Sequence, residues 1–194
     1  GISLVIDIQN SIKAQESRGY EHWAKIHNLK QAARTLNFLT ENRIDSYAEL
    51  SAKIAEVNAA NEQAAGALKG VERRLADMVV LIKHITTYQK TKPVYDAYRR
   101  AKDKAAYRAA HESSIILFEA AAKAVKPALV GGKLPNVAAL QAEYAKLQEQ
   151  KETLYADYGR LKKQVKEYDV IKRNIDSILR RESEPERGKE IARE

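Results

Sequence analysis

Histidine, tyrosine and lysine are the side chains of this chain that could do chemistry, and the spacing of the histidines argues against a catalytic centre. They stand at positions 22, 27, 84 and 111, with no two of them four residues apart. His111-Glu112 is not followed by the second histidine of a zinc-protease helix. Val130-Gly131-Gly132-Lys133 lacks the spacing of a phosphate-binding loop and fits a simple turn. We therefore expect no catalytic residue, no metal site and no cofactor here.

Tyrosine could supply a nucleophile that attacks DNA, and the chain has ten tyrosines. Such a reaction would need a metal held by histidines in the order His-hydrophobic-His, which the sequence lacks. A tyrosine on an apolar helix face packs its ring and leaves its hydroxyl at the edge of the core. We expect this packing role for Tyr20, Tyr47, Tyr95, Tyr98, Tyr107, Tyr144, Tyr158 and Tyr168.

Two dense groups of basic residues are the clearest sign of binding. Residues 92–108 hold six Lys or Arg against two Asp, and residues 160–181 hold eight against three acids, in a chain of net charge +8. Such groups could follow the phosphates of DNA with steep salt dependence and little sequence specificity. A solvated helix face is the alternative, and the sequence favours both about equally. The residues expected to contact DNA are Arg99, Arg100, Lys102, Lys104, Lys162, Lys163, Lys166, Arg173 and Arg180.

Two long stripes of mostly apolar residues must position these groups. Within each stripe the residues are alternately three and four apart, which predicts a long helix with a narrow seam. The first stripe is Tyr47, Leu50, Ile54, Val57, Asn61, Ala64, Leu68, Val71, Leu75, Met78, Ile82 and Ile85. The second is Val137, Leu140, Tyr144, Leu147, Lys151, Leu154, Tyr158, Leu161, Val165, Tyr168, Lys172, Ile175 and Leu179.

Antiparallel pairing of the two stripes is the simplest way to join them through the residues between. It predicts that Leu50 lies near Leu179 and that Ile85 lies near Tyr144. The same register predicts acidic partners for the two seam lysines and a close approach at two glycines. These pairs are Lys151 with Asp77, Lys172 with Glu56, and Gly70 opposite Gly159.

The fold class that follows is all-α, a long antiparallel coiled-coil hairpin with short helices packed at both ends. Gly19 is a plausible helix stop with a new helix from Tyr20, Ser46 with Glu49 forms a capping box, and Pro93 is expected to begin a new helix after one that ends near Tyr88. The predicted segments are N-terminal helices at 1–45, a first coiled-coil helix at 46–90, a helical insert at 91–134, a second coiled-coil helix at 135–181, and a charged, disordered tail at 182–194.

Composition fits a protein of the cytoplasm. The chain has no cysteine, so it can hold neither disulfides nor thiolate metal sites. No apolar run approaches the roughly 20 residues of a membrane span, so no membrane insertion is expected. Because residue 1 is Gly and the chain opens inside an amphipathic segment, we expect a piece of a longer protein.

Several stretches resemble the helical carboxy-terminal region of relaxases, the mobilisation nucleases of conjugative and mobilisable elements in gut Firmicutes. The resemblance covers about residues 5–187. It is carried by Gly19-Tyr-Glu-His-Trp-Ala-Lys-Ile-His-Asn-Leu-Lys-Gln-Ala-Ala, by Lys92-Pro-Val-Tyr-Asp-Ala-Tyr with Ala110-His-Glu-Ser-Ser-Ile-Ile-Leu-Phe-Glu-Ala-Ala, and by Leu161-Lys-Lys-Gln-Val-Lys-Glu-Tyr-Asp-Val-Ile-Lys-Arg-Asn-Ile.

The resemblance implies a part in plasmid or transposon transfer by conjugation. In such a relaxase an amino-terminal nuclease domain nicks one DNA strand with a tyrosine and a histidine-held metal, and no residue of that domain matches this chain. The chain itself is thus expected to be a non-catalytic accessory region that touches DNA backbone or transfer-machinery proteins. The alternative is a coiled-coil scaffold for protein interaction or self-association, without DNA binding.

Overall fold

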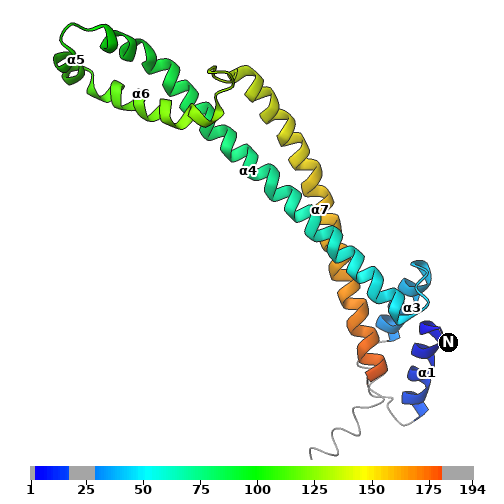
Figure 1. Cartoon of the computed structure of the whole chain (residues 1–194). Helices are drawn as coiled ribbons and strands as arrows, with labels where there is room; N and C mark the ends of the chain where they lie inside the picture. The colour runs from blue at the N-terminus through cyan, green and yellow to red at the C-terminus, as the bar shows by residue number, and fades with distance from the viewer. Residues whose placement is uncertain (1–2, 18–28, 181–194) are drawn as a thin grey trace, which may run out of the picture. The chain divides into compact units, whose positions relative to one another are not determined.

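The computed structural model describes residues 3–17 and 29–180, and these are helical, which confirms the all-α prediction. The predicted helix stop at Gly19, the helix start at Tyr20 and the tail at 182–194 lie outside the described residues. The β-structure in the described part is a single isolated bridge between Val130 and Lys133. The helices are α1 (Leu4–Ser17), α3 (Leu29–Glu41), α4 (Tyr47–Arg100), α5 (Lys104–Ala110), α6 (Glu112–Val125) and α7 (Val137–Arg180), with a 3-10 turn at Lys126–Ala128 (Figure 1).

The chain divides into two compact units. Unit 1 combines Gly1–Ala64 with Asp157–Glu194, and unit 2 is Ala65–Ala156. Both long helices, α4 and α7, contribute one part to each unit. Each unit therefore contains a pairing of α4 with α7 together with its own short helices, and each is described separately below.

Unit 1 has a core in which α1 and α3 pack on the start of α4 and the end of α7 (Figure 1). The largest fully buried side chains are aliphatic, because α1 and α3 present apolar residues at helical spacing to the two long helices. Phe38 of α3 and Tyr168 of α7 add an edge-to-face ring contact, with centroids 5.0 Å apart. The fully buried core residues of this unit include Ile8, Leu39, Ile44, Leu50, Ile171 and Ile175.

The start of α4 has the predicted cap, with one change of partner. Ser46 Oγ accepts a hydrogen bond from the Glu49 N–H at 3.1 Å, as a capping box requires. The Glu49 carboxylate accepts from the Asp45 N–H at 2.7 Å instead of from Ser46. The Asp45 carbonyl in turn accepts from the Leu4 N–H at 2.9 Å, which ties the beginning of α1 to this cap.

Helix α4 runs through Pro93 to Arg100, so the prediction that it ends near Tyr88 is wrong. Proline removes one helical hydrogen bond and usually kinks or ends a helix. Here the turns on both sides of Pro93 are held by α6, because Tyr88 and Tyr95 both contact the ring of Phe118, with centroid distances of 4.8 and 4.2 Å. Tertiary packing therefore carries the helix through the proline.

Unit 2 consists of α5, α6 and the adjoining parts of the two long helices. Helix α6 runs back beside α4 (Figure 1) and joins a second apolar cluster with Met78, Ile85, Val125 and Leu140. The segment before α7 turns at Gly131 and Gly132, whose φ angles are 58° and 76°. Val130 and Lys133 exchange backbone hydrogen bonds of 3.0 and 3.1 Å across this turn, which is the two-residue turn of a type that favours glycine.

Burial follows both predicted stripes. All thirteen positions of the second stripe are buried or half-buried, and in the first stripe only Tyr47 is exposed, at 40%. The hydroxyl of Tyr47 donates to Asp176 of α7 at 2.8 Å. Asn61 is a polar member of the first stripe, and its buried Oδ1 has no hydrogen-bond partner among the described residues. The two long helices thus pack along the seam that the spacing predicts.

The direction of pairing is antiparallel within each unit, but the predicted partners of the seam lysines are wrong. Lys151 pairs with Glu72 at 3.9 Å and not with Asp77, which lies five residues further along α4, about 7.5 Å of helix rise. Glu56, the predicted partner of Lys172, instead pairs with Lys53 of its own helix at 3.7 Å.

The two glycines that were predicted to face each other, Gly70 and Gly159, are not explained by a close approach of the helices. A Cβ placed on Gly70 or on Gly159 would meet no atom within 4 Å. The structure therefore gives no steric reason for glycine at either position, and the predicted close approach is wrong.

Candidate nucleic-acid interface

Four basic residues gather where α4 ends and α5 begins, and we call them the turn cluster: Arg99, Arg100, Lys102 and Lys104. All four side chains are exposed. They are brought together because only three residues join the two helices, and Asp103 caps α5 by accepting from the Ala106 N–H at 3.1 Å. Arg100 Nε donates to the Asp96 carbonyl at 3.3 Å, which leaves its other guanidinium donors directed elsewhere.

Arg108 lies in the same stretch of sequence but is held within unit 2. Its guanidinium donates to both carboxylate oxygens of Glu119, at 3.0 and 3.4 Å, and lies 5.8 Å from the centre of the Tyr98 ring. Hydrogen bonds to Glu119 and then to Tyr98 raise the pKa of Arg108 above its ordinary value. This arginine fixes α5 to α6 and is not counted in the turn cluster.

A row of aromatic rings lies on the helices that carry the turn cluster. Tyr98 contacts Tyr95 at 5.8 Å and Tyr107 at 6.3 Å, and Tyr107 stacks on His111 at 4.1 Å. The Nδ1 atom of His111 also lies 3.1 Å from the carbonyl oxygen of Tyr107. The packing role predicted for Tyr95, Tyr98 and Tyr107 is confirmed, since their rings hold α4, α5 and α6 together.

A second exposed group, the α7 cluster, consists of Lys162, Lys163, Lys166 and Arg173 in unit 1. Lys162, Lys166 and Arg173 are four and seven residues apart, so they share one face of the helix. Among the described residues none of the four forms an ion pair, whereas Arg160 pairs with Asp157 at 4.0 Å. Arg180 is the last residue of α7, and its side chain lies outside the described part.

Sequence reasoning missed two basic residues of α3, Lys30 and Arg34. Both are exposed and line a shallow groove of about 420 Å³ together with Glu41 of α3 and Glu167 of α7. Lys163 is one turn from Glu167 on the same face of α7. The four-residue spacing of Lys30 and Arg34 in the sequence could have indicated a basic helix face. Only the packing of α3 on α7 brings this face to the same side of unit 1 as Lys163.

The turn cluster lies in unit 2 and the α7 cluster in unit 1, so each forms a basic surface of its own. Both present exposed cations on helices, with acidic residues between them: Asp96 and Asp103 near the turn cluster, Glu167 and Asp169 near the α7 cluster. Such a surface can bind phosphates by charge. Helical side chains of this kind fix position on a nucleic acid without reading its bases.

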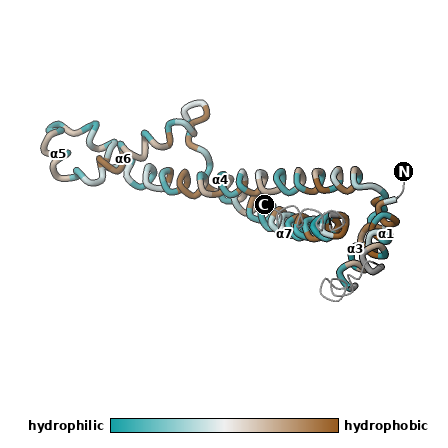
Figure 2. Tube along the Cα trace, turned by 90° about the horizontal axis from the view of Figure 1, so that it is seen from below, coloured by the Kyte–Doolittle hydropathy of each residue, from teal (hydrophilic) through white to brown (hydrophobic). Residues whose placement is uncertain are grey.

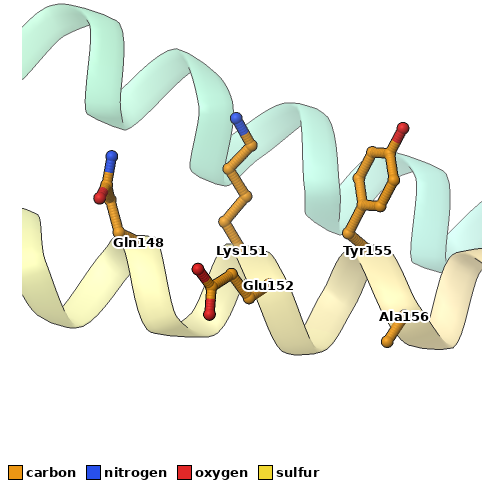
Figure 3. A pocket seen from close by; sticks show the side chains of 5 residues that line it. All are labelled: Gln148, Lys151, Glu152, Tyr155 and Ala156. Atoms are coloured by element: carbon orange, nitrogen blue, oxygen red, sulfur yellow. The ribbon is translucent and has the colours of Figure 1, made fainter.

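A groove on α7 in unit 2 contains a lysine and a tyrosine, side chains that could take part in a reaction. It encloses about 420 Å³ and is lined by Gln148, Lys151, Glu152, Tyr155 and Ala156 (Figure 3). Gln148, Lys151 and Tyr155 extend toward α4, where the Lys151 ammonium pairs with Glu72. One helix supplies the whole lining, Tyr155 is 62% exposed, and Lys151 already has its carboxylate partner. The groove therefore has none of the enclosure or activated side chains of a catalytic pocket.

Residues 3–17 and 29–180 hold neither a group of metal ligands nor a membrane-spanning helix. No group of three or more His, Asp or Glu side chains in these ranges could hold a metal ion. Of the histidines, His84 is half-buried, His111 stacks on Tyr107, and His22 and His27 lie outside the described residues. Within the same ranges no helix has both the length and the apolar character needed to span a bilayer.

Comparison of the chain with protein-family models, with curated proteins and with solved structures finds no match.

Proposed function

We propose that this chain is a non-catalytic helical region of a DNA relaxase that contacts DNA backbone during conjugative transfer. The observation that carries the DNA contact is the pair of exposed basic surfaces, the turn cluster and the α7 cluster. Their cations are directed to solvent, and those of the α7 cluster have no carboxylate partner in the described part of the chain. The relaxase context comes from the family resemblance of the sequence.

The proposal extends to how α4 and α7 pair. We propose that they form a coiled coil, in which each seam side chain inserts between four residues of the facing helix. Support comes from the burial of the stripe residues, from the ion pair of Lys151 with Glu72, and from that of Arg74 with Glu143 at 3.1 Å. This pairing uses the seams, so the basic faces outside them stay available to DNA.

The DNA contact is tested by reversing charge in the α7 cluster. The variant K162E/K163E/K166E should weaken binding to duplex DNA at low salt and should reduce the dependence of affinity on salt. Each phosphate contact removed lowers the slope of log affinity against log salt by about 0.9 on B-DNA. Titration by fluorescence anisotropy at several salt concentrations measures both quantities.

A matched control separates a local contact from the effect of net charge. Lys69, Lys83 and Lys146 are exposed and lie outside both clusters, so K69E/K83E/K146E changes the charge equally. The proposal requires that this control bind DNA more tightly than K162E/K163E/K166E. Equal affinities in the two variants would show only general attraction, and an unchanged affinity in both would end the proposal of a DNA contact at the α7 cluster.

The turn cluster is tested in the same way with R99Q/R100Q/K102Q/K104Q. These substitutions remove four charges and leave the Asp103 cap intact. If the α7 cluster alone binds DNA, this variant keeps the affinity and the salt slope of the unaltered chain. If the turn cluster also binds, both quantities fall.

A protein-interaction scaffold is the second candidate function. The specific observation in its favour is the exposure of Ile116 and Leu117 on α6, at 50% and 52%. Adjacent large apolar side chains that are exposed to solvent mark protein-interaction surfaces more often than they mark DNA-binding surfaces. Light scattering of the chain alone measures self-association, and the DNA titration measures DNA binding. A chain that self-associates but does not bind DNA supports the scaffold.

A further inference from the structure

Helix α6 is apolar on the face that turns away from α4. Its inward residues Ile115, Phe118, Ala121 and Val125 are buried. In Figure 2 pale and brown colours predominate along α6, with short teal interruptions, so most residues of this helix are not hydrophilic. The outward stripe is Ser113, Leu117, Ala120 and Ala124, all exposed, with Ile116 beside it.

The outward stripe has the spacing of a helix seam. Its members are four, three and four residues apart, which is the pattern that pairs helices side by side. A surface helix normally carries charged residues on its solvent face. Here Glu112, Glu119 and Lys123 are the charged residues of the 14-residue helix, and all three lie to one side of the stripe. The face therefore resembles the seams of α4 and α7 but has no helix over it in the described structure.

The stripe is symmetric about its own centre, which points to a second copy of the same face. When two copies of α6 lie antiparallel, Leu117 of one copy meets Ala120 of the other, and Ser113 meets Ala124. The Leu117–Ala120 contact thus pairs a larger side chain with a smaller one, the Ser113–Ala124 contact pairs two small ones, and a twofold axis repeats both. Parallel pairing would instead put Leu117 against Leu117 and leave the small residues facing each other across a gap.

Charge agrees with the antiparallel arrangement. Glu112 is in the first turn of α6 and Lys123 is in its last turn, on the same edge of the stripe. In an antiparallel pair of identical helices, the same edge of the stripe in the two copies lies side by side. Glu112 of each copy therefore comes near Lys123 of the other. Glu119 is held by Arg108 at 3.0 Å and so does not oppose its own copy as a free charge.

We propose that the outer face of α6 is a homodimer interface, in which two copies of the chain pair α6 antiparallel through Leu117, Ala120 and the Glu112–Lys123 edge. This pairing is independent of the basic clusters and of the relaxase context. It uses residues of unit 2 that no other described helix covers.

The first test is the oligomeric state of the full chain across the micromolar range, by sedimentation velocity. Leu117→Lys should raise the dimer dissociation constant roughly a hundredfold, because the substitution removes two buried leucines from each dimer. Val79→Lys is the matched control, since Val79 is equally exposed at 52% and lies on the side of α4 opposite Tyr88, the residue that packs on α6. Far-UV circular dichroism checks that both variants remain helical.

The second test exchanges the two charges. Glu112→Lys and Lys123→Glu should each weaken the dimer, since each places like charges together twice, and the double variant should restore it. A chain that is monomeric throughout overturns the proposal, as does a dimer that Leu117→Lys leaves unchanged. A dimer that Leu117→Lys weakens but that the double charge variant fails to restore overturns the antiparallel arrangement. DNA affinity measured on the Leu117→Lys variant reports on the DNA contact separately.

Discussion

The two units bury their seams in different ways. In unit 1 four helices meet, and the core contains fully buried aliphatic side chains from α1, α3, α4 and α7, such as Ile8, Leu39, Leu50 and Ile175. In unit 2 the apolar cluster is smaller, and rings of Tyr88, Tyr95 and Phe118 supply much of the contact between α4 and α6. The long helices are thus covered by other helices in unit 1 but remain largely open in unit 2.

This difference shows what short helices contribute to a long helical pair. A seam alone buries one narrow stripe, whereas helices packed on it bury the neighbouring faces as well. Unit 1 leaves single apolar side chains such as Ile6 and Val170 exposed, at 47% and 40%. Unit 2 leaves two adjacent pairs about half exposed, Val79 with Val80 and Ile116 with Leu117, so it has the denser apolar surface to offer a partner.

The largest expected effect compares the same substitution in both cores. Ile175 and Ile115 are both fully buried, and isoleucine to alanine costs about 2–5 kcal/mol of unfolding free energy, depending on the cavity left. Ile175→Ala should fall near the top of this range, because α1, α3 and α4 surround it. Ile115→Ala should fall near the bottom, since Ile115 is part of neither large cluster. Urea unfolding followed by circular dichroism measures both.

Val170→Ala is the control for this comparison. Val170 is on α7 in the same unit but is 40% exposed, so its replacement should change the free energy by about 0.5 kcal/mol or less. Equal losses for the two isoleucine variants would show that the cores are equally tight and would remove the contrast between the units.

The aromatic contacts give a second comparison. Among the described residues Phe118 contacts two rings and Phe38 contacts one, and an aromatic pair is worth about 0.5–1.5 kcal/mol beyond its buried area. Phe118→Leu should therefore lose about 1–3 kcal/mol, and Phe38→Leu about half as much. Local stability of α6 and α3 is read from amide hydrogen exchange. A larger loss at Phe38 would contradict the view that unit 2 depends on its rings.

Helix caps sharpen the comparison at smaller size. Ser46→Ala and Asp103→Ala each remove one cap, for about 1 kcal/mol. Ser46 begins a helix that enters the core of unit 1, so its loss should lower global stability. Asp103 begins the seven-residue helix α5, so its loss should accelerate hydrogen exchange there with no change in global unfolding. Ser51→Ala, at an exposed position within α4, is a control expected to be neutral.

The stripes of α4 and α7 could be predicted because burial along a helix repeats with the helical period and needs no knowledge of distant residues. The continuation through Pro93 could not, since it depends on the ring of Phe118 in α6, which is over 20 residues away in sequence. The predicted partner of Lys151 was displaced by five residues because apolar positions repeat about once per helical turn, so several registers match the same spacing. Local features such as the cap at Ser46 and the turn at Gly131 could be predicted, because the residues that form each of them are neighbours in sequence.

The basic residues show the same limit. Arg99 and Lys162 lie outside the two apolar stripes, so their exposure could be predicted from the sequence. Arg108 counts as basic in any window of sequence, yet Glu119 neutralises it locally. Lys30 and Arg34 were missed because α3 meets α7 only in the folded chain.

The smallest expected effect concerns the pH dependence of unit 1. Burial raises the pKa of Tyr168, Lys53 lowers it, and Glu56 and Glu167 raise it, with a net rise. A raised pKa in the folded state means that the neutral phenol adds stability, which is complete below the unfolded pKa of about 10 and is lost as pH rises through the folded value. Tyr168→Phe keeps the ring contact with Phe38 but cannot ionise.

The variant should therefore lose less thermal stability than the unaltered chain between neutral pH and strongly alkaline pH, with equal behaviour below pH about 9. Tyr155→Phe is the control, because Tyr155 is 62% exposed and belongs to neither apolar cluster. Melting temperatures measured over the alkaline range test the difference. Identical curves of melting temperature against pH for Tyr168→Phe and the unaltered chain would mean that the phenol of Tyr168 reaches water freely. The core of unit 1 would then exclude water from its tyrosine no better than unit 2 excludes it from its aromatic rings.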